Sequence, residues 1–201
     1  MRLQEARRDY YRKLAKEHGF RSRAAYKLLE INNSYHVIQR EMYVADLGCA
    51  PGGWLQVASK LVGNNGKVLG VDIRHVDPLP RVQIIQGDVS DDSLAEKIID
   101  ATKRKVNVLL SDLAPNISGV WQLDHARQIS LTQSAVSIAE KILVNNGNAV
   151  LKAFEGEMLN ELKSELKTKF NKLYLYKPKS SRKASSEIYL VCLGYDASQH
   201  I

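Results

Sequence analysis

The sequence predicts an α/β protein with a mostly parallel sheet that carries helices on both faces. From residue 43 onward, short β-branched or apolar runs alternate with amphipathic stretches of helical spacing. The runs are continuously apolar, which is typical of strands that are covered on both sides of a sheet. Residues 1–41 depart from this pattern, because they are basic and have helical periodicity.

The first 41 residues are expected to form a basic helical N-terminal extension. Apolar residues recur near helical spacing in two groups, Tyr10 and Leu14, then Ala24, Leu28 and Ile31. Gly19 lies between the groups and predicts a break between two helices.

Residues 42–201 are expected to form the core of the same single domain, 1–201. Seven apolar runs predict strands at 43–47, 67–72, 82–86, 106–112, 147–154, 172–178 and 187–195. Four stretches between them predict helices at 53–62, 92–103, 124–145 and 157–169. We expect the last two strands to pair antiparallel.

Composition restricts the class of protein. With 44% hydrophobic and 25% charged residues, the chain has the composition of a soluble globular domain. No apolar stretch approaches the ~20 residues that cross a bilayer, and the charged N-terminus lacks the apolar core of a secretory signal. Cys49 and Cys192 show no metal or redox spacing, and the five histidines form no pair at ligand spacing. We therefore expect a cytoplasmic protein without a metal site, and a monomer.

The net charge of +7 is concentrated in two segments of the chain. Residues 1–41 hold ten Lys or Arg against five acids, and residues 177–183 hold four basic residues and no acid. A polyanion such as RNA is the natural partner of such patches, and a solvated basic surface is the alternative. The candidate phosphate contacts are Arg21, Arg23, Lys179, Arg182 and Lys183.

Four predicted strands end in an acidic residue. These residues are Asp46, Asp72, Asp88 and Asp112. Because the carboxyl ends of parallel strands meet at one edge of a sheet, the four should converge. One such residue is often only a helix cap or a turn residue, but crowded carboxylates cost free energy unless a ligand or cation compensates. The four acids therefore predict a ligand site at this edge.

A glycine-rich loop follows the first of these acids and opens a predicted helix. It has the spacing Gly48-x-x-x-Gly52-Gly53, which is neither GxGxxG nor a phosphate loop ending in GK[ST]. Glycine lets a ligand approach the backbone closely. The loop therefore predicts close contact with a ligand that has no phosphates to bind.

The acids indicate which ligand this is. Asp72 ends the second strand, where an acid can accept both hydroxyls of a ribose. Asp88 can accept a hydrogen bond from an adenine amino group, and a cationic or amino-acid end would lie near Asp46 and Asp112. S-adenosylmethionine fits this description.

These motifs resemble those of the FtsJ/RrmJ-type RNA 2′-O-ribose methyltransferases, over nearly the whole chain. The motifs in order are RSRAAYKLLEI (21–31), DLGCAPGGW (46–54), GVDIR (70–74), QGD (86–88), SDLAPNISG (111–119), VLKAF (150–154) and KPKSSRKASSEIYLV (177–191). The resemblance implies a Rossmann-like class I methyltransferase fold with a seven-stranded sheet, and S-adenosylmethionine as methyl donor. Trp54 is expected to pack beside the glycine loop, with its backbone at the cofactor.

The resemblance also implies a catalytic tetrad of Lys27, Asp112, Lys152 and Glu187. Lys152 is expected to contact the ribose 2′-hydroxyl, either as a base or as a positive charge that stabilises the developing alkoxide. A base needs a lowered pKa, which burial and the neighbouring ammonium of Lys27 favour and the two carboxylates oppose.

The leading hypothesis is an S-adenosylmethionine-dependent RNA 2′-O-methyltransferase that acts on a uridine of large-subunit ribosomal RNA. A transfer-RNA anticodon-loop enzyme is the alternative within the class. A non-catalytic RNA-binding ribosome assembly factor is a second alternative, against which the complete tetrad argues. The basic flanks and the lack of an inserted substrate-covering domain argue against a small-molecule methyltransferase.

Overall fold

The computed structural model describes residues 3–181 and 185–200, which are built around one seven-stranded sheet. The strands are β1 (Tyr43–Leu47), β2 (Lys67–Asp72), β3 (Val82–Gln86), β4 (Val106–Ser111), β5 (Leu143–Phe154), β6 (Phe170–Tyr176) and β7 (Glu187–Tyr195). Their order is β3-β2-β1-β4-β5-β7-β6. Strands β1 to β5 pair in parallel, and β7 runs antiparallel between β5 and β6. The predicted mostly parallel sheet and the antiparallel final pair are both confirmed.

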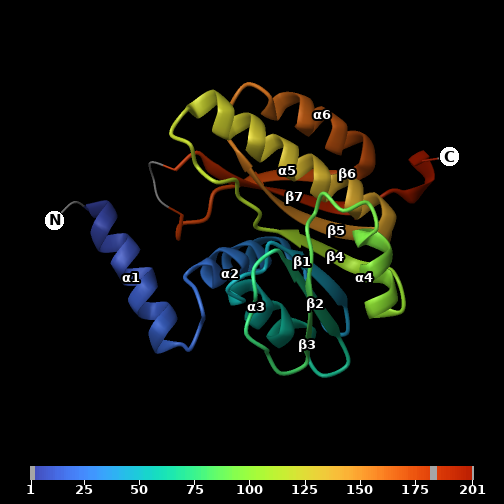
Figure 1. Cartoon of the computed structure of the whole chain (residues 1–201), viewed down its shortest axis with the longest axis horizontal. Coiled ribbons are helices and arrows are strands. Elements are labelled where there is room, and N and C mark those ends of the chain that lie inside the picture. The colour runs from blue at the N-terminus through green and yellow to red at the C-terminus, as the bar shows by residue number, and fades with distance from the viewer. Residues whose placement is uncertain (1–2, 182–184, 201) are drawn as a thin grey trace.

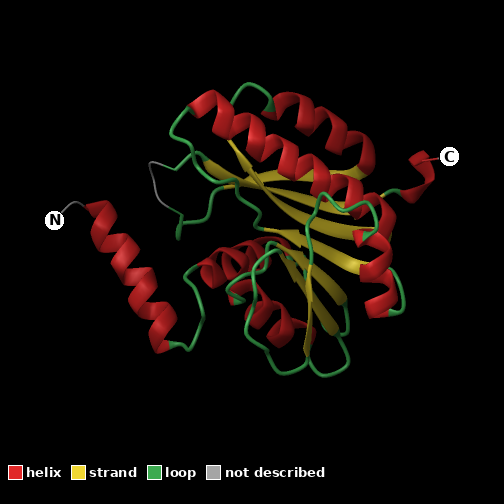
Figure 2. Cartoon of the chain, in the orientation of Figure 1, coloured by secondary structure: helices red, strands yellow, loops and turns green. Residues whose placement is uncertain are grey.

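Helices cover both faces of the sheet, as predicted (Figure 2). Helices α2 (Ala24–Tyr35) and α3 (Gly53–Val62) pack on the face that carries Val44, Val108 and Val150. Helices α4 (Leu94–Thr102), α5 (Trp121–Ile142) and α6 (Leu159–Lys169) cover the opposite face, and a short 3-10 helix (Ala197–His200) follows β7. Helix α1 (Leu3–Glu17) stands away from the sheet, beyond α2 (Figure 1).

Several element bounds differ from the sequence prediction by one to four residues, as for β6, which was predicted at 172–178 and lies at 170–176, and the largest change is at the start of β5. Helix α5 ends at Ile142 and β5 begins at Leu143, so residues 143–145 are strand where a helix was predicted. A continuous apolar run such as 142–144 suits a buried strand as well as a helix, so periodicity alone does not place the change. Pairing with β4 decides it, since Leu143 pairs with Val106.

None of the helices in the described part of the chain is long and apolar enough to cross a membrane.

Candidate active site

Two cavities adjoin at the carboxyl edge of the sheet, next to β1. Strand β1 lies between β2 and β4, so the strand order reverses here, and α/β sheets bind ligands in the crevice outside such a point. The larger cavity has a volume of about 570 Å³ and the smaller about 240 Å³. Gly48, Ala50 and Asp112 line both, so the two spaces meet beside the Asp112 carboxylate.

Three of the four strand-end acids line the larger cavity, which confirms that they converge. Asp72 Oδ2 accepts a hydrogen bond from the Ala50 N–H at 2.8 Å, and its Oδ1 accepts one from the Arg74 N–H at 2.9 Å. Asp88 is exposed at the cavity wall and accepts from the Ser90 N–H at 2.9 Å. Asp72 therefore also fixes the conformation of the glycine loop.

Asp46 lies behind the cavities, lines neither, and is completely buried. Neither of its carboxylate oxygens has a hydrogen-bond partner within the described structure. Burial, followed by the nearby charges of Asp112 and Asp72, raises the pKa of Asp46 well above its ordinary value. Because its folded pKa exceeds its unfolded one, Asp46 contributes most to stability below its ordinary pKa and costs stability as the pH rises.

We therefore expect Asp46→Asn to stabilise the ligand-free protein at neutral pH. A gain of about 1 kcal/mol would raise the melting temperature by about 2–4 °C in a chain of this size. Thermal unfolding at pH 7.5 and near pH 4 measures it, and the gain should shrink at the lower pH. Asp72→Asn is the matched control and should destabilise, since its oxygens accept hydrogen bonds. A lower melting temperature of Asp46→Asn at pH 7.5 would contradict the expectation.

The glycines of the loop accommodate other parts of the chain at all three positions, and a Cβ at Gly48 would lie 2.9 Å from Leu113 Cδ2. A Cβ at Gly53 would lie 2.3 Å from Ser22 Oγ, and one at Gly52 would lie 2.9 Å from Arg21 Nη1. Gly48 has a φ of 75° and lines both cavities, whereas Gly53 lines only the smaller and Gly52 neither. Gly48 therefore lies at the wall of both cavities while Leu113 packs against it, and the other two glycines let the segment before α2 pack against the loop.

The four tetrad side chains lie together in a closed ring of polar contacts at the junction of the cavities. Lys27 Nζ lies 2.7 Å from Glu187 Oε1. Lys152 Nζ lies 2.8 Å from Asp112 Oδ1 and 3.7 Å from Glu187 Oε2. Tyr189 closes the ring, because its hydroxyl donates to Asp112 Oδ1 at 2.6 Å and accepts from Lys27 Nζ at 3.2 Å. Both lysines are buried, with 7% of each residue exposed.

Tyr189 was not predicted as a site residue. It is completely buried and pairs with Lys152 across β5 and β7, while Trp54 packs on its ring at a centroid distance of 5.6 Å. Trp54 is itself buried, and its indole N–H donates to the Ala24 carbonyl at 2.8 Å, as expected for a residue that packs beside the loop. The one signal in the sequence is the spacing of two from Glu187, which places both side chains on one face of a strand.

The carboxylates determine the charge of Lys152. Burial alone would lower the pKa of Lys152, but Asp112 and then Glu187 outweigh it and raise the pKa above its ordinary value of 10.5. Burial likewise opposes ionisation of Asp112, yet Lys152 and Lys27 lower the pKa of this carboxyl. The ring therefore holds Lys152 as an ammonium and Asp112 as a carboxylate at neutral pH.

Two helices hold the ring in place from outside it. On α5, Gln128 Nε2 donates to the Lys152 and Leu113 carbonyls at 3.2 and 3.3 Å, and so joins the ends of β5 and β4. On α2, the Glu30 carboxylate accepts from the Lys179 and Ser180 N–H groups at 2.6 and 3.0 Å. The loop after β6 is thereby attached to the helix that carries Lys27.

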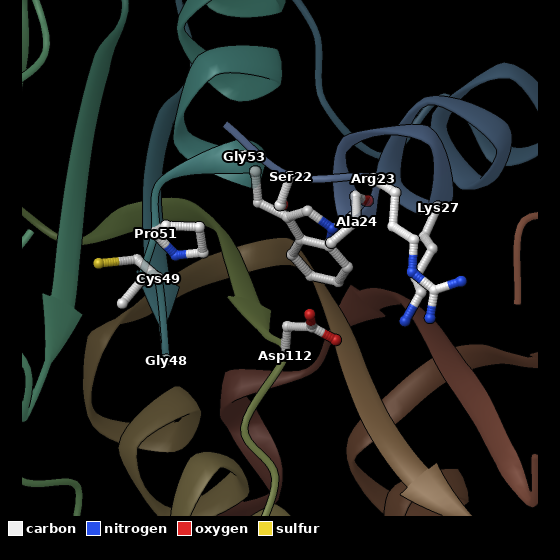
Figure 3. Close-up of a pocket in the computed structure, with 11 residues that line it drawn as sticks. Ser22, Arg23, Ala24, Lys27, Gly48, Cys49, Pro51, Gly53 and Asp112 are labelled. Atoms are coloured by element: carbon white, nitrogen blue, oxygen red, sulfur yellow. Dashed lines mark hydrogen bonds between the residues drawn. The ribbon is translucent and has the colours of Figure 1, made fainter. Parts of the chain in front are cut away.

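The predicted phosphate contacts lie in different environments. Arg23 lines the smaller cavity beside Lys27, and Figure 3 shows both side chains at one side of it. The Arg21 guanidinium donates to the carbonyls of Pro51, Asp77 and Pro78, so this residue ties the segment before α2 to neighbouring loops. The Lys179 side chain is exposed.

Arg182 and Lys183, the other two predicted phosphate contacts, lie outside the described residues. Residues 3–181 and 185–200 contain no group of three or more His, Cys, Asp or Glu side chains arranged to hold a metal ion.

Comparison with known proteins gives the same class of protein over most of the chain. The model of the FtsJ-like methyltransferase family matches residues 20–195. The ribosomal RNA large subunit methyltransferase E of Nitrosopumilus maritimus is 52% identical over 97% of this chain and 99% of its own length. The protein of the same name from Cenarchaeum symbiosum is 48% identical over the same shares.

A solved structure gives the fold independently. The structure named as a ribosomal RNA methyltransferase from Plasmodium falciparum has a TM-score of 0.79 and 34% identity, covering 88% of this chain and 98% of that one. This likeness confirms the Rossmann-like methyltransferase fold that the motifs imply. The family match and the two archaeal relatives together establish that this chain belongs to the FtsJ-like methyltransferases.

Proposed function

We propose that this chain uses S-adenosylmethionine to methylate a ribose 2′-hydroxyl in large-subunit ribosomal RNA. The observation that carries the proposal is the buried ring of Lys27, Asp112, Lys152 and Glu187 where two cavities meet. The relatives named ribosomal RNA large subunit methyltransferase E support the substrate. We expect the protein to act in the cytoplasm, where its two buried free thiols stay reduced.

The residues present fit the methyl donor. Asp72 and Asp88 line the larger cavity, where they suit the ribose hydroxyls and the adenine amino group. The volume of about 570 Å³ lies within the range of small-molecule sites. The Asp112 carboxylate, which lines both cavities, would face the cationic end of the ligand. Bound there, S-adenosylmethionine would supply a methyl group activated by its sulfonium.

The smaller cavity suits the acceptor. Lys27 and Arg23 line it, so phosphate charge can be compensated where the ribose enters. As the 2′-hydroxyl loses its proton, its oxygen gains negative charge, which the Lys152 ammonium stabilises more than it stabilises the neutral hydroxyl. Because the carboxylates hold Lys152 protonated, we infer that it acts through its charge and that the proton leaves to solvent. Asp112 and Glu187 hold the ammonium in one orientation, and Tyr189 holds Asp112. Alignment of the reacting atoms itself accelerates transfer.

Methylation of undermodified RNA tests the proposal. Purified protein with labelled S-adenosylmethionine should transfer label to large ribosomal subunits that lack the modification, and digestion should place the label on a ribose. Undermodified transfer RNA, run in parallel, should remain unlabelled. Label in transfer RNA alone would favour the anticodon-loop alternative, and label in neither, with the donor bound, would favour an assembly factor.

A further inference from the structure

Three aromatic rings stack where α5 begins. The Trp121 ring lies 5.6 Å from the ring of His125 at an interplanar angle of 20°, and 6.1 Å from that of Phe154 at 22°. His125 and Phe154 are buried, whereas 45% of Trp121 is exposed. The two buried rings therefore support an indole that keeps nearly half of its surface in solvent.

The indole is connected to the active site through β5. Phe154, one of its supports, lies two residues after Lys152 on this strand. His125, the other support, fills the space beside Gly156, where a Cβ would lie 2.5 Å from its ring. The rings therefore pack against the end of the strand that carries Lys152.

A second connection runs through the loop between β4 and α5. This loop leads from Asp112 to Trp121, and its first residues, 113–116, line the larger cavity. The Asp124 carboxylate accepts hydrogen bonds from the Ser118 and Gly119 N–H groups at 2.8 and 3.1 Å. The loop is thus held in one conformation, and with it the position of Trp121 relative to the cavity.

The loop before Trp121 carries exposed apolar side chains, and a guanidinium of α5 bonds to the same loop. Ile117 is 65% exposed and Val120 is 55% exposed, in the same loop. The exposed Arg127 guanidinium reaches the Asn116 carbonyl at 3.4 Å. An exposed aromatic ring next to exposed apolar residues of the same loop suits the face of a nucleobase, and a guanidinium bonded to that loop suits a phosphate of the same strand.

We propose that Trp121 stacks on an unpaired base of the substrate RNA that flanks the ribose held at Lys152. This inference rests on the proposed function and adds a subsite to it. Stacking on an aromatic side chain holds a strand without selecting its sequence, since every base has a π face. The contact would fix the RNA on the far side of the target nucleotide from Arg23 and α2.

Indole fluorescence tests the contact without requiring methyl transfer. Titration with a single-stranded oligouridylate of about 12 nucleotides, within the site sizes of single-strand binders, should quench the emission of Trp121. Trp54, the other tryptophan, is buried at the wall of the smaller cavity, so any quenching of Trp54 persists in Trp121→Phe, and the quenching that this variant loses measures the contact at Trp121. Quenching that is absent, or equal in Trp121→Phe, would overturn the proposal. Trp121 emission that changes with protein concentration but not with RNA would also overturn the proposal. It would indicate that a second copy of the protein, and not a base, covers the indole.

Affinity and turnover give the second measurement. Trp121→Ala should weaken oligonucleotide binding about 5- to 100-fold, and Trp121→Phe should restore most of it. Leu123→Ala is the matched control, because Leu123 is 42% exposed on the same helix and is not one of the three stacked rings. A ribosomal RNA substrate with an abasic nucleotide next to the methylated one should lower the methylation rate of the wild type. The same substrate should not lower the rate of Trp121→Ala below its rate on intact RNA.

The outcomes separate this inference from the proposed function. A wild-type protein that methylates no RNA contradicts the proposed function, and quenching by RNA still decides whether Trp121 contacts a base. A wild type that methylates RNA, with Trp121→Ala equal to it in affinity and turnover, overturns only the stacking contact.

Discussion

Lys152→Ala is expected to lower turnover about 10²- to 10⁴-fold. This is the range for loss of a positioned acid–base group or of a group that stabilises charge in the transition state. The ammonium lies 2.8 Å from the Asp112 carboxylate and 2.9 Å from the Asp112 carbonyl, so it is fixed against the residue that lines both cavities. No other described group of the ring takes its place, because Lys27 is paired with Glu187 on the opposite side. Single-turnover methylation of ribosomal RNA measures the loss.

Binding of the donor distinguishes this role from a structural one. Lys152 lines neither cavity, so calorimetry with S-adenosylmethionine should give nearly the same affinity for Lys152→Ala and for the wild type. Lys172→Ala is the control, since Lys172 is exposed on β6 of the same sheet. Turnover of Lys152→Ala at the wild-type rate would remove the role proposed for this residue.

Asp112→Asn is expected to impair both binding and chemistry, because Asp112 touches both cavities and the ring. The variant loses the carboxylate that pairs with Lys152 and accepts from Tyr189. We expect turnover to fall about 10²- to 10³-fold and donor affinity to fall as well, since a cationic ligand loses a counter-charge. Calorimetry measures the affinity for the donor, and single-turnover rates measure the chemical step. If neither changes in Asp112→Asn, the role assigned to Asp112 in binding and chemistry is contradicted.

The same variant predicts a change in pH dependence. In the wild type the pKa of Lys152 is raised above 10.5, so the ammonium persists and turnover should not decline through its deprotonation at neutral to mildly alkaline pH. Without Asp112, burial opposes the charge more effectively and the pKa of Lys152 falls. Residual turnover of Asp112→Asn should therefore decline with rising pH at lower values than in the wild type. A rate that instead rises with pH would indicate that Lys152 acts as a base.

The alternation of apolar runs with amphipathic stretches was sufficient to predict all seven strands of the sheet, but several element bounds were misplaced. Strand β7 was predicted from residues 187–195 and has those bounds, because its apolar residues are continuous. The end of α5 was misplaced, because the apolar residues at 142–144 suit either element and pairing with Val106 decides between them.

The site was harder to predict, because it depends on pairings between distant segments. Nothing in the sequence sets the register that places Lys152 opposite Tyr189, so the tetrad came from family resemblance and Tyr189 was missed. The glycines of the loop were interpreted as space for a ligand, whereas Ser22 and Arg21 occupy the space at Gly53 and Gly52. Such contacts between the N-terminal segment and the loop leave no local signal in either one.

The closed ring joins residues 27 and 187, and its last two members lie on a strand that inserts between β5 and β6. During synthesis, a nascent chain can therefore fold much of its parallel sheet while its catalytic charges are still unpaired. Methyl transfer should begin only after β7 has left the ribosomal exit tunnel, so the enzyme is silent until residues 187–195 have joined the sheet.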